Sequence, residues 1–190
     1  MAQLGLVRSG GRIHAFETRD SAIEWMEDRI LEGAGWTPQE EGPLLALDEI
    51  DVFRGLDAAM LADLGRAVEK RSLPAGGLVC SHGDTSDEMF LVRRGRVHAL
   101  PSLEGGKRHH LATFCRGDFF GEIAFLDREP RSADAEAATP VDLYALSRSR
   151  FDEVVKGNPV LGSRNFEEIA SAMSTRLRMT DTELRMLEQR

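Results

Sequence analysis

Short hydrophobic runs separated by glycine dominate the middle of the chain, from residue 71 to residue 147. Runs of four to eight residues between turn-forming residues at regular intervals are typical of an all-β barrel or sandwich. The pattern predicts turns at Gly76-Gly77, Gly83-Asp84, Gly95 and Gly105-Gly106. The strands expected between and after these turns are 78–81, 89–93, 96–100, 109–114, 131–138 and 141–146.

Helical spacing replaces this pattern on both sides of the predicted β region. Before it, Asp57 is a good N-cap for a helix that runs to about Lys70 and carries Met60, Leu61, Leu64 and Val68 on one face. After it, Ser147 is a second N-cap, followed by a short helix, a break at Gly157-Asn158-Pro159 and a long final helix. We therefore expect a mainly β fold with flanking helices, of the α+β class.

The final helix has a regular stripe at alternating steps of four and three residues. Its members are Phe166, Ala170, Met173, Leu177, Thr180, Leu184 and Leu187. Three heptads are at the lower limit for a coiled coil, so two interpretations stay open: the stripe pairs with a second copy of the chain as a homodimer, or it packs on its own β domain. Five arginines and five acidic residues from Arg164 onward balance, which argues against a basic arm for nucleic acid.

The first 33 residues look separate from the β region. They predict a strand at Arg12–Phe16 and an amphipathic helix that carries Ala22, Ile23, Trp25, Met26, Ile30 and Leu31. Glycines, prolines and acidic residues then interrupt the pattern, as in a linker. We expect an N-terminal segment at 1–33, a linker at 34–47 and the main domain at 48–190.

Composition narrows the classes of partner. The 190 residues include 24 Lys and Arg against 32 Asp and Glu, and the formal net charge of −8 argues against bulk attraction to nucleic acid or to an anionic membrane. No apolar stretch approaches the roughly 20 residues of a membrane helix, and no signal peptide follows Met1. Cys80 and Cys115 lack the spacing of a disulfide scaffold or a zinc site, so we expect a cytoplasmic protein in which both are small core residues of strands.

The segment from Gly117 to Ala133 holds the residues best suited to a ligand. Gly121 permits close backbone approach, and the residues after it can begin a short helix whose free N–H groups bind an anion. Arg131 could bring its planar guanidinium to the same anion. Glu122 would repel a phosphate, so a hydroxyl group, such as that of a sugar, is its natural partner. The alternative is that Glu122 and Arg131 simply form a salt bridge across the turn.

At these residues the sequence resembles the cyclic nucleotide-binding domain family. The phosphate-binding cassette of that family reads like Gly121-Glu122-Ile123-Ala124 followed by Arg131-Ser132-Ala133. Leu73-Pro74-Ala75-Gly76 is similar to the opening turn of the family. Its next hairpin is similar to Gly83-Asp84 with Met89-Phe90-Leu91-Val92 and Gly95-Arg96-Val97. The resemblance covers about residues 48 to 180. It implies a double-stranded β-helix, a jelly-roll-like β-roll with N-terminal helices and a C-terminal lid helix.

The same resemblance implies a role for each candidate site residue. The N–H groups from Gly121 to Ala124, with Ile123 among them, and the side chain of Arg131 would hold the cyclic phosphate. Glu122 would accept the ribose 2′-hydroxyl, and Ser132 would lie near the phosphate or the base. In relatives a Thr at the position of Ser132 tends to accompany cGMP and an Ala cAMP, so Ser132 leaves both nucleotides open. The final helix would cap the purine with a residue between Met173 and Arg178, and no metal is implied.

The N-terminal segment resembles the last strand and helix of a STAS domain, through Gly11–Phe16 and Ser21–Glu27. STAS domains end the cytoplasmic part of sulfate-permease-type transporters. The resemblance therefore implies that the chain is a fragment attached to a transporter domain; the alternative is a short decoration that packs on the β-roll. Related bacterial transcription factors carry a helix-turn-helix after the lid helix. Because the last residues read as one uninterrupted helix and the net charge is acidic, we expect no DNA-binding helix-turn-helix within these 190 residues.

An enzyme of the cupin type is the main competing class. His109 and His110 would point to opposite faces of a strand, and His82 and His98 lack partners at useful spacing, so a metal site is not expected. No nucleophile elbow, Walker loop or HExxH motif occurs. A third hypothesis is a β-roll that makes protein contacts and binds no nucleotide. The intact Glu122 and Arg131 favour a non-catalytic cAMP or cGMP sensor that signals through its final helix to an attached effector.

Overall fold

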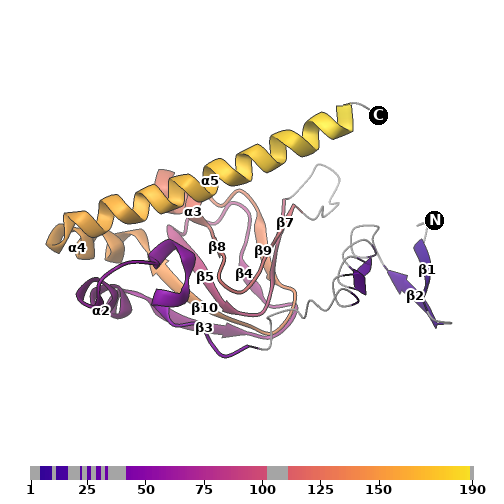
Figure 1. Ribbon diagram of the computed structural model, residues 1–190, viewed down its shortest axis with the longest axis horizontal. Coiled ribbons are helices and arrows are strands. Elements are labelled where there is room, and N and C mark those ends of the chain that lie inside the picture. Colours follow the sequence, from indigo (N-terminus) through magenta and orange to yellow (C-terminus); the bar gives the residue numbers. More distant parts are fainter. Residues whose placement is uncertain are drawn as a thin grey trace.

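Two four-stranded antiparallel sheets form the body of the protein (Figure 1), as seen in a computed structural model that describes residues 5–9, 12–16, 42–101 and 111–188 and a few positions from Ala22 to Gly33. In the first sheet the strand order is β3 (Glu69–Leu73), β10 (Val141–Ser147), β5 (Glu88–Arg94) and β8 (Phe119–Phe120). In the second sheet it is β4 (Leu78–Cys80), β9 (Asp134–Ala137), β6 (Val97–Leu100) and β7 (Ala112–Phe114). The predicted β-roll is confirmed.

Side-chain alternation along β5 builds two hydrophobic cores. Phe90 and Val92 point between the two sheets, where they join a cluster with residues of β4, β6, β9 and β10. Met89 and Leu91 point to the opposite face, where they pack with residues of the helices. Because successive side chains of a strand point to opposite faces, one apolar strand can serve both cores. All four of these residues have at most 1% of their surface exposed.

Helices cover the outer face of the first sheet. Two short 3-10 turns, η2 (Leu47–Glu49) and η3 (Asp51–Phe53), precede α2 (Ala58–Ala67); α3 (Glu122–Asp127) interrupts the strands, and α4 (Arg148–Gly157) and α5 (Pro159–Glu188) follow them. Both predicted N-caps are confirmed: Asp57 Oδ1 accepts the N–H of Met60 at 2.9 Å, and Ser147 Oγ accepts the N–H of Arg150 at 3.4 Å.

Helix α5 runs across the roll (Figure 1) and is attached near its start to the segment around η3. Asn165 is 1% exposed, and its Nδ2 donates to the carbonyl of Val52 at 3.2 Å. Arg164 Nη1 donates to the carbonyl of Gly55 at 3.0 Å. These bonds fix where the helix leaves the body of the domain.

The face of α5 that packs on the domain differs from the predicted stripe. Phe166 and Met173 pack against the core, but Ala170, Leu177 and Thr180 are exposed. The buried face instead follows Leu161, Asn165 and Ile169. Hydrophobic spacing alone misplaced it because Asn165, a polar residue, occupies a central buried position. The side chains of Leu184 and Leu187 lie outside the described residues.

The helix predicted to reach Lys70 ends at Ala67, which corrects the expectation. Val68 is extended, with φ −83° and ψ 146°, and the next residues form β3. Strand β3 is an edge strand that pairs antiparallel with β10, with Leu73 opposite Val141 and Glu69 opposite Ala145. Its sequence Glu-Lys-Arg-Ser-Leu has one apolar residue, so no alternation indicates a strand, and pairing with β10 decides the conformation.

Other differences from the predicted strands are local. Arg131 lies before β9 and not within a strand, and the two-residue β8 was not predicted. The strand expected at 109–114 is described only as Ala112–Phe114, so His109 and His110 lie outside the described residues.

Cys80 is buried in β4 as expected, and burial raises the pKa of its thiol. Cys115 is exposed in the turn after β7, so its expected core position was wrong.

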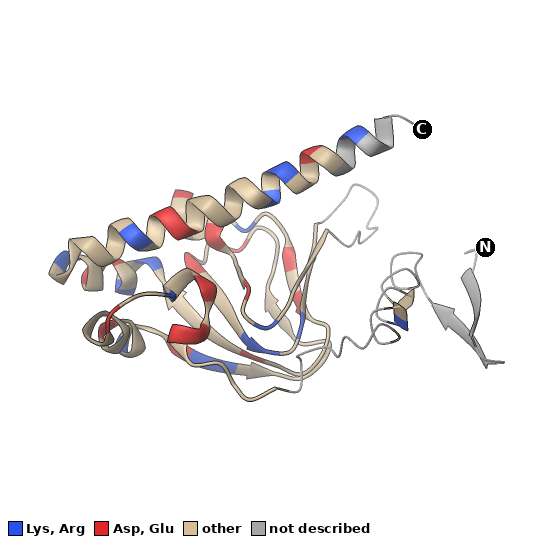
Figure 2. Ribbon diagram, in the orientation of Figure 1, with Lys and Arg blue, Asp and Glu red and all other residues tan. Residues whose placement is uncertain are grey.

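The N-terminal part contains a hairpin of β1 (Gly5–Ser9) and β2 (Arg12–Phe16), which confirms the predicted strand. The described positions from Ala22 to Gly33 are helical; the rest of that predicted helix and most of the predicted linker lie outside the described residues. The last linker residues contact the roll, since Leu45 is 6% exposed and donates its N–H to the carbonyl of Arg93 at 3.3 Å. Figure 2 shows acidic and basic residues interspersed over the roll and along α5.

Candidate ligand site

Gly121 forms a tight junction between β8 and α3. It caps α3 with φ +76°, a left-handed conformation that favours glycine. A Cβ at this position would lie 2.6 Å from Nη1 of Arg131 and 3.0 Å from the carbonyl oxygen of Glu88, so a side chain has no room. As in any α-helix, the N–H groups of the first turn, those of Glu122, Ile123 and Ala124, have no partner within the helix. The junction therefore offers backbone donors next to a guanidinium.

Arg131 is buried, with 4% of its surface exposed. Nη1 donates to the carbonyl of Gly121 at 3.1 Å, Nη2 donates to Oγ of Ser86 at 3.1 Å, and the guanidinium lies 5.2 Å from the ring centroid of Phe90. Nε has no hydrogen-bond partner, and among the described residues no carboxylate lies within ion-pair distance. A buried cation without a counter-ion is costly, and an anionic ligand would remove that cost.

Glu122 is buried at 7% exposure, and its partner comes from the far end of the chain. Its Oε1 accepts a hydrogen bond from Nη1 of Arg176 at 2.9 Å. Nη2 of Arg176 donates to the carbonyl of Phe119 at 2.6 Å, and the guanidinium lies 4.8 Å and 5.0 Å from the ring centroids of Phe119 and Phe114. Helix α5 thus contacts the acidic residue of the site directly.

These contacts decide one point left open by the sequence. Glu122 pairs with Arg176 and not with Arg131, so the simple salt bridge across the turn is not formed. The expectation that a residue between Met173 and Arg178 caps the purine stays a prediction; within that range Arg176 contacts the carboxylate of Glu122.

The remaining predicted site residues differ in exposure. Ala124 is buried at 3%, so its side chain belongs to the support of α3. The side chain of Ile123 is 45% exposed, which leaves only its N–H group suited to the anion. Ser132 is exposed next to Arg131, before β9. The structure therefore brings Gly121, Glu122 and Arg131 together and leaves Ile123 and Ser132 at the surface.

Sequence reasoning missed the residues behind Arg131. Ser86, at the end of the loop before β5, accepts from Arg131, and Glu88, the first residue of β5, lies behind Ser86. Neither belongs to the Gly121–Ala133 segment, and 45 residues separate Ser86 from Arg131. In the sequence, both residues lie between the predicted turn at Gly83-Asp84 and the predicted strand 89–93, and this position alone could have pointed to them.

Asp118 lies near the lid contact. Burial raises the pKa of its carboxyl, although the N–H of Cys115 donates to Oδ2 at 2.8 Å and the charge of Arg176 acts in the opposite direction.

Among the described residues no group of three or more His, Cys, Asp and Glu side chains could hold a metal ion. The described helices include none that is both long and apolar enough to span a bilayer. The buried Arg131 with its unpaired Nε, the N–H groups at the start of α3 and the carboxylate of Glu122 together suit an anion joined to a hydroxyl group.

Known proteins share this architecture and this segment. Residues 70–158 match the cyclic nucleotide-binding domain family. A cyclic nucleotide-gated potassium channel of Rhizobium etli is 35% identical over 111 residues, which are 58% of this chain and 29% of the channel. Glutaminase 1 of Bradyrhizobium diazoefficiens is 30% identical over 175 residues, which are 92% of this chain and 28% of that protein.

A solved structure agrees with the sequence matches. The catabolite activator protein of Thermus thermophilus superimposes with a TM-score of 0.62 at 29% identity, and the match covers 73% of this chain and 63% of that one. The first curated relatives are much longer, since this chain spans less than a third of their length. Over residues 70–158 the chain is therefore similar to a cyclic nucleotide-binding domain, and it is similar to parts of a cyclic nucleotide-gated potassium channel and of a catabolite activator protein.

Proposed function

We propose that this chain is a non-catalytic regulatory module that binds a cyclic nucleotide, cAMP or cGMP, and passes the signal through α5 to an attached effector. The observation that carries the proposal is Arg131: a guanidinium that is 4% exposed, has an unpaired Nε and has no carboxylate partner among the described residues. A cyclic phosphate supplies one negative charge at that point. The match of residues 70–158 to the family supports the same ligand.

Each group of the nucleotide has a candidate partner. The phosphate is held by Arg131 and by the N–H groups from Gly121 to Ala124, because charge-assisted bonds from a planar guanidinium suit phosphate oxygens. The ribose 2′-hydroxyl donates to Glu122, whose Oε1 is bonded to Arg176. Ser132 lies near the phosphate or the base and leaves the choice between cAMP and cGMP open.

Transmission depends on the contact between Arg176 and Glu122. A bound ribose changes the surroundings of the Glu122 carboxylate, and Arg176 is the residue of α5 that touches it. The nucleotide shifts α5 only to the extent that its affinity differs between the two positions of the helix. If Arg176 and the ribose can both bond Glu122, the lid helix α5 closes further. If they compete for Glu122, the lid helix opens.

A thermal-shift series tests binding itself. The chain is heated with cAMP, cGMP or 5′-AMP at up to about 100 times an assumed micromolar dissociation constant, at which binding adds about 2.7 kcal/mol of stability. For a chain of this size that corresponds to a rise in Tm of roughly 5 to 10 °C. We expect the rise with at least one cyclic nucleotide and not with 5′-AMP. No rise with any of them would favour the alternative function, a β-roll that serves only as a protein interaction module.

The effector is proposed to be covalently attached on the N-terminal side. The STAS-like segment favours a sulfate-permease-type transporter domain, which would put this module in the cytoplasm. An attached enzyme is a second candidate, because the match to the glutaminase covers 92% of this chain and so extends beyond the nucleotide-binding domain. The test adds the nucleotide that binds this chain to the complete effector protein and measures sulfate transport and glutamine hydrolysis. A change in one of these activities distinguishes the transporter from the enzyme.

A homodimer through α5 is proposed from the exposed part of the predicted stripe. Leu177, a member of that stripe, is 63% exposed, so its own domain does not cover this apolar side chain. We expect sedimentation to give the mass of a dimer and Leu177→Asp to give that of a monomer. A wild-type chain that sediments as a monomer would contradict the proposal.

A further inference from the structure

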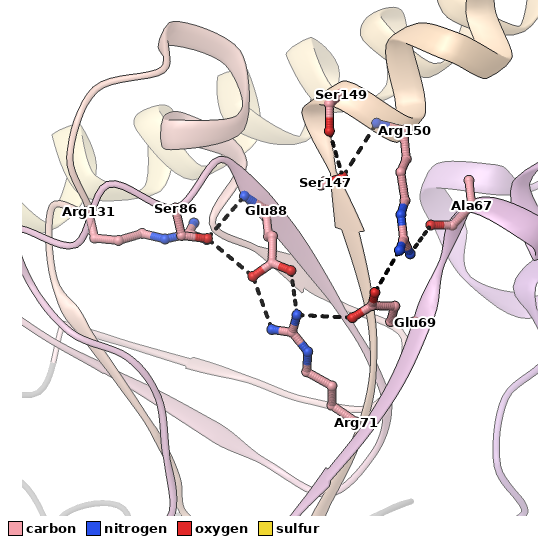
Figure 3. Close-up of polar contacts among 9 residues, drawn as sticks. All are labelled: Ala67, Glu69, Arg71, Ser86, Glu88, Arg131, Ser147, Ser149 and Arg150. Carbon is pink, nitrogen blue, oxygen red and sulfur yellow. Dashed lines mark hydrogen bonds and ion pairs between the residues drawn. The ribbon is translucent and has the colours of Figure 1, made fainter.

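Ser86 holds the guanidinium of Arg131 from the side opposite to the backbone of Gly121. Nη2 of Arg131 is the donor in this bond, so the hydroxyl oxygen of Ser86 must offer a lone pair to it at 3.1 Å. The hydroxyl proton is directed elsewhere: Oγ donates to Oε2 of Glu88 at 3.1 Å (Figure 3). Glu88 therefore sets the orientation in which Ser86 can serve as an acceptor for Arg131.

Glu88 is in turn held by Arg71 of β3, which is separated from β5 by β10 in the sheet. Both terminal nitrogens of the Arg71 guanidinium donate to the two carboxylate oxygens of Glu88, with Nη1 3.0 Å from Oε2. Such a two-point pair is rigid as well as strong. The hydrogen bond to Glu88 also raises the pKa of Arg71, so this guanidinium keeps its charge.

The carboxylate of Glu88 also links two cations. It is bonded to Arg71 directly and to Arg131 through Ser86. The guanidinium groups of Arg131 and Arg71 lie 5.2 Å and 5.7 Å from the ring centroid of Phe90. A negative charge bonded to one cation and linked to the other reduces the repulsion between them.

We infer that Ser86 and Glu88 are positioning residues for the ligand anion, and that they act by fixing the direction of the Arg131 guanidinium. Arg131 has five N–H donors, of which one is used by the carbonyl of Gly121 and one by Ser86. These two bonds on different nitrogens leave Nε and two further N–H groups for the anion. The inference rests on the proposed function, because the anion is the cyclic phosphate.

The chain of contacts continues beyond Arg71, and this outer part supplies a control. Arg71 also bonds Glu69 at 3.3 Å, and Arg150 of α4 bonds Glu69 at 2.8 Å and the carbonyl of Ala67 at 3.4 Å (Figure 3). The side chains of Glu69 and Arg150 are 46% and 47% exposed. Exposed ion pairs contribute little, so Glu69→Gln should leave ligand affinity unchanged.

Calorimetric titration with cAMP and with cGMP tests the inference. We expect Ser86→Ala to raise the Kd for either nucleotide roughly tenfold, the effect of losing one hydrogen bond to a charged group. Ser86→Thr, which keeps the hydroxyl, should bind within about twofold of the wild type, and Glu88→Gln should weaken binding in the same direction as Ser86→Ala. Both nucleotides should be affected by the same factor, because the phosphate is common to them.

A double-mutant cycle distinguishes positioning from a general loss of structure. In an Arg131→Lys background the guanidinium that Ser86 orients is gone, so Ser86→Ala should add almost nothing to the loss of affinity. Ser72→Ala removes another serine–carboxylate bond, 2.6 Å from Ser72 Oγ of β3 to Asp142 Oδ1 of β10, and should leave Kd unchanged.

The outcomes separate the two proposals. A wild type that binds while Ser86→Ala binds equally well overturns the positioning role alone. An additive loss in the double variant also overturns it. A folded wild type that binds neither nucleotide overturns the proposed function, and the positioning role falls with it.

Discussion

Two arginines reach the candidate site from different parts of the chain, and they differ in burial and in hydrogen-bond partners. Arg131 is 4% exposed, contacts one aromatic ring and has no carboxylate partner among the described residues. The side chain of Arg176 is 33% exposed, contacts two aromatic rings and pairs with Glu122. Their difference in partners suggests a difference in role.

Each arginine makes two hydrogen bonds, but only Arg131 has a buried Nε without an acceptor, and only Arg176 has a carboxylate partner. An N–H group without an acceptor in the interior is rare, so the unpaired Nε of Arg131 indicates a missing partner. Arg176 already bonds a carboxylate and a carbonyl. We therefore assign the affinity for the anion to Arg131 and the response of the lid to Arg176.

Replacement of Arg131 should produce the largest loss. Arg131→Ala removes the cation that faces the phosphate, and we expect binding to weaken by roughly 2 to 5 kcal/mol, as for a buried charged partner. Arg94→Ala is the matched control, because Arg94 is an arginine in an exposed pair with Asp142. Calorimetry on both variants, after a check of the fold by circular dichroism, gives the comparison. Equal affinity in the wild type and in a folded Arg131→Ala variant would refute the site.

Replacement of Glu122 should cost less. Glu122→Ala removes one charged hydrogen bond to the ribose, and about 1.5 to 3 kcal/mol of binding free energy should be lost. A nucleotide without the 2′-hydroxyl provides the complementary change. The wild type should bind 2′-deoxy-cAMP more weakly than cAMP, and Glu122→Ala should no longer distinguish them. Persistent discrimination in the variant would place the ribose elsewhere.

Replacement of Arg176 should have the smallest effect on affinity. Arg176→Met keeps an unbranched stem against the rings of Phe114 and Phe119 but removes the bond to Glu122. Because the side chain of Arg176 is 33% exposed, we expect its pair with Glu122 to contribute up to about 1 kcal/mol and its loss to raise Kd at most about fivefold, mainly through faster dissociation. Stopped-flow measurement of the dissociation rate checks this. Tighter binding in the variant would instead indicate that Arg176 and the ribose compete for Glu122.

The inner half of the site could be predicted from the sequence because its residues are close together along the chain. Gly121, Glu122 and Arg131 lie within eleven positions, and a glycine at a turn between a strand and a short helix restricts what can surround it. The strands and turns of the roll followed from glycine spacing for the same reason. Local patterns suffice where neighbouring residues build the structure.

The supporting residues could not be predicted because tertiary packing selects them. Ser86 and Arg176 reach the site across 45 and 54 positions of sequence, and neither lies in a hydrophobic pattern. The helix predicted up to Lys70 failed for a related reason, since the polar β3 becomes a strand only by pairing with β10. The packed face of α5 was misplaced because the buried Asn165 interrupts the apolar stripe.

The bonds of Asn165 and Arg164 to the η3 region make the start of α5 a pivot. Arg176 lies eleven residues further along, about 16 Å at 1.5 Å per residue. A tilt of about 5° around Asn165 would therefore carry the Arg176 end by about 1.4 Å, enough to break its hydrogen bond of 2.9 Å to Glu122. Such a tilt would make the helix a lever arm, by which a rotation of a few degrees changes the contact between Arg176 and Glu122 at the proposed site.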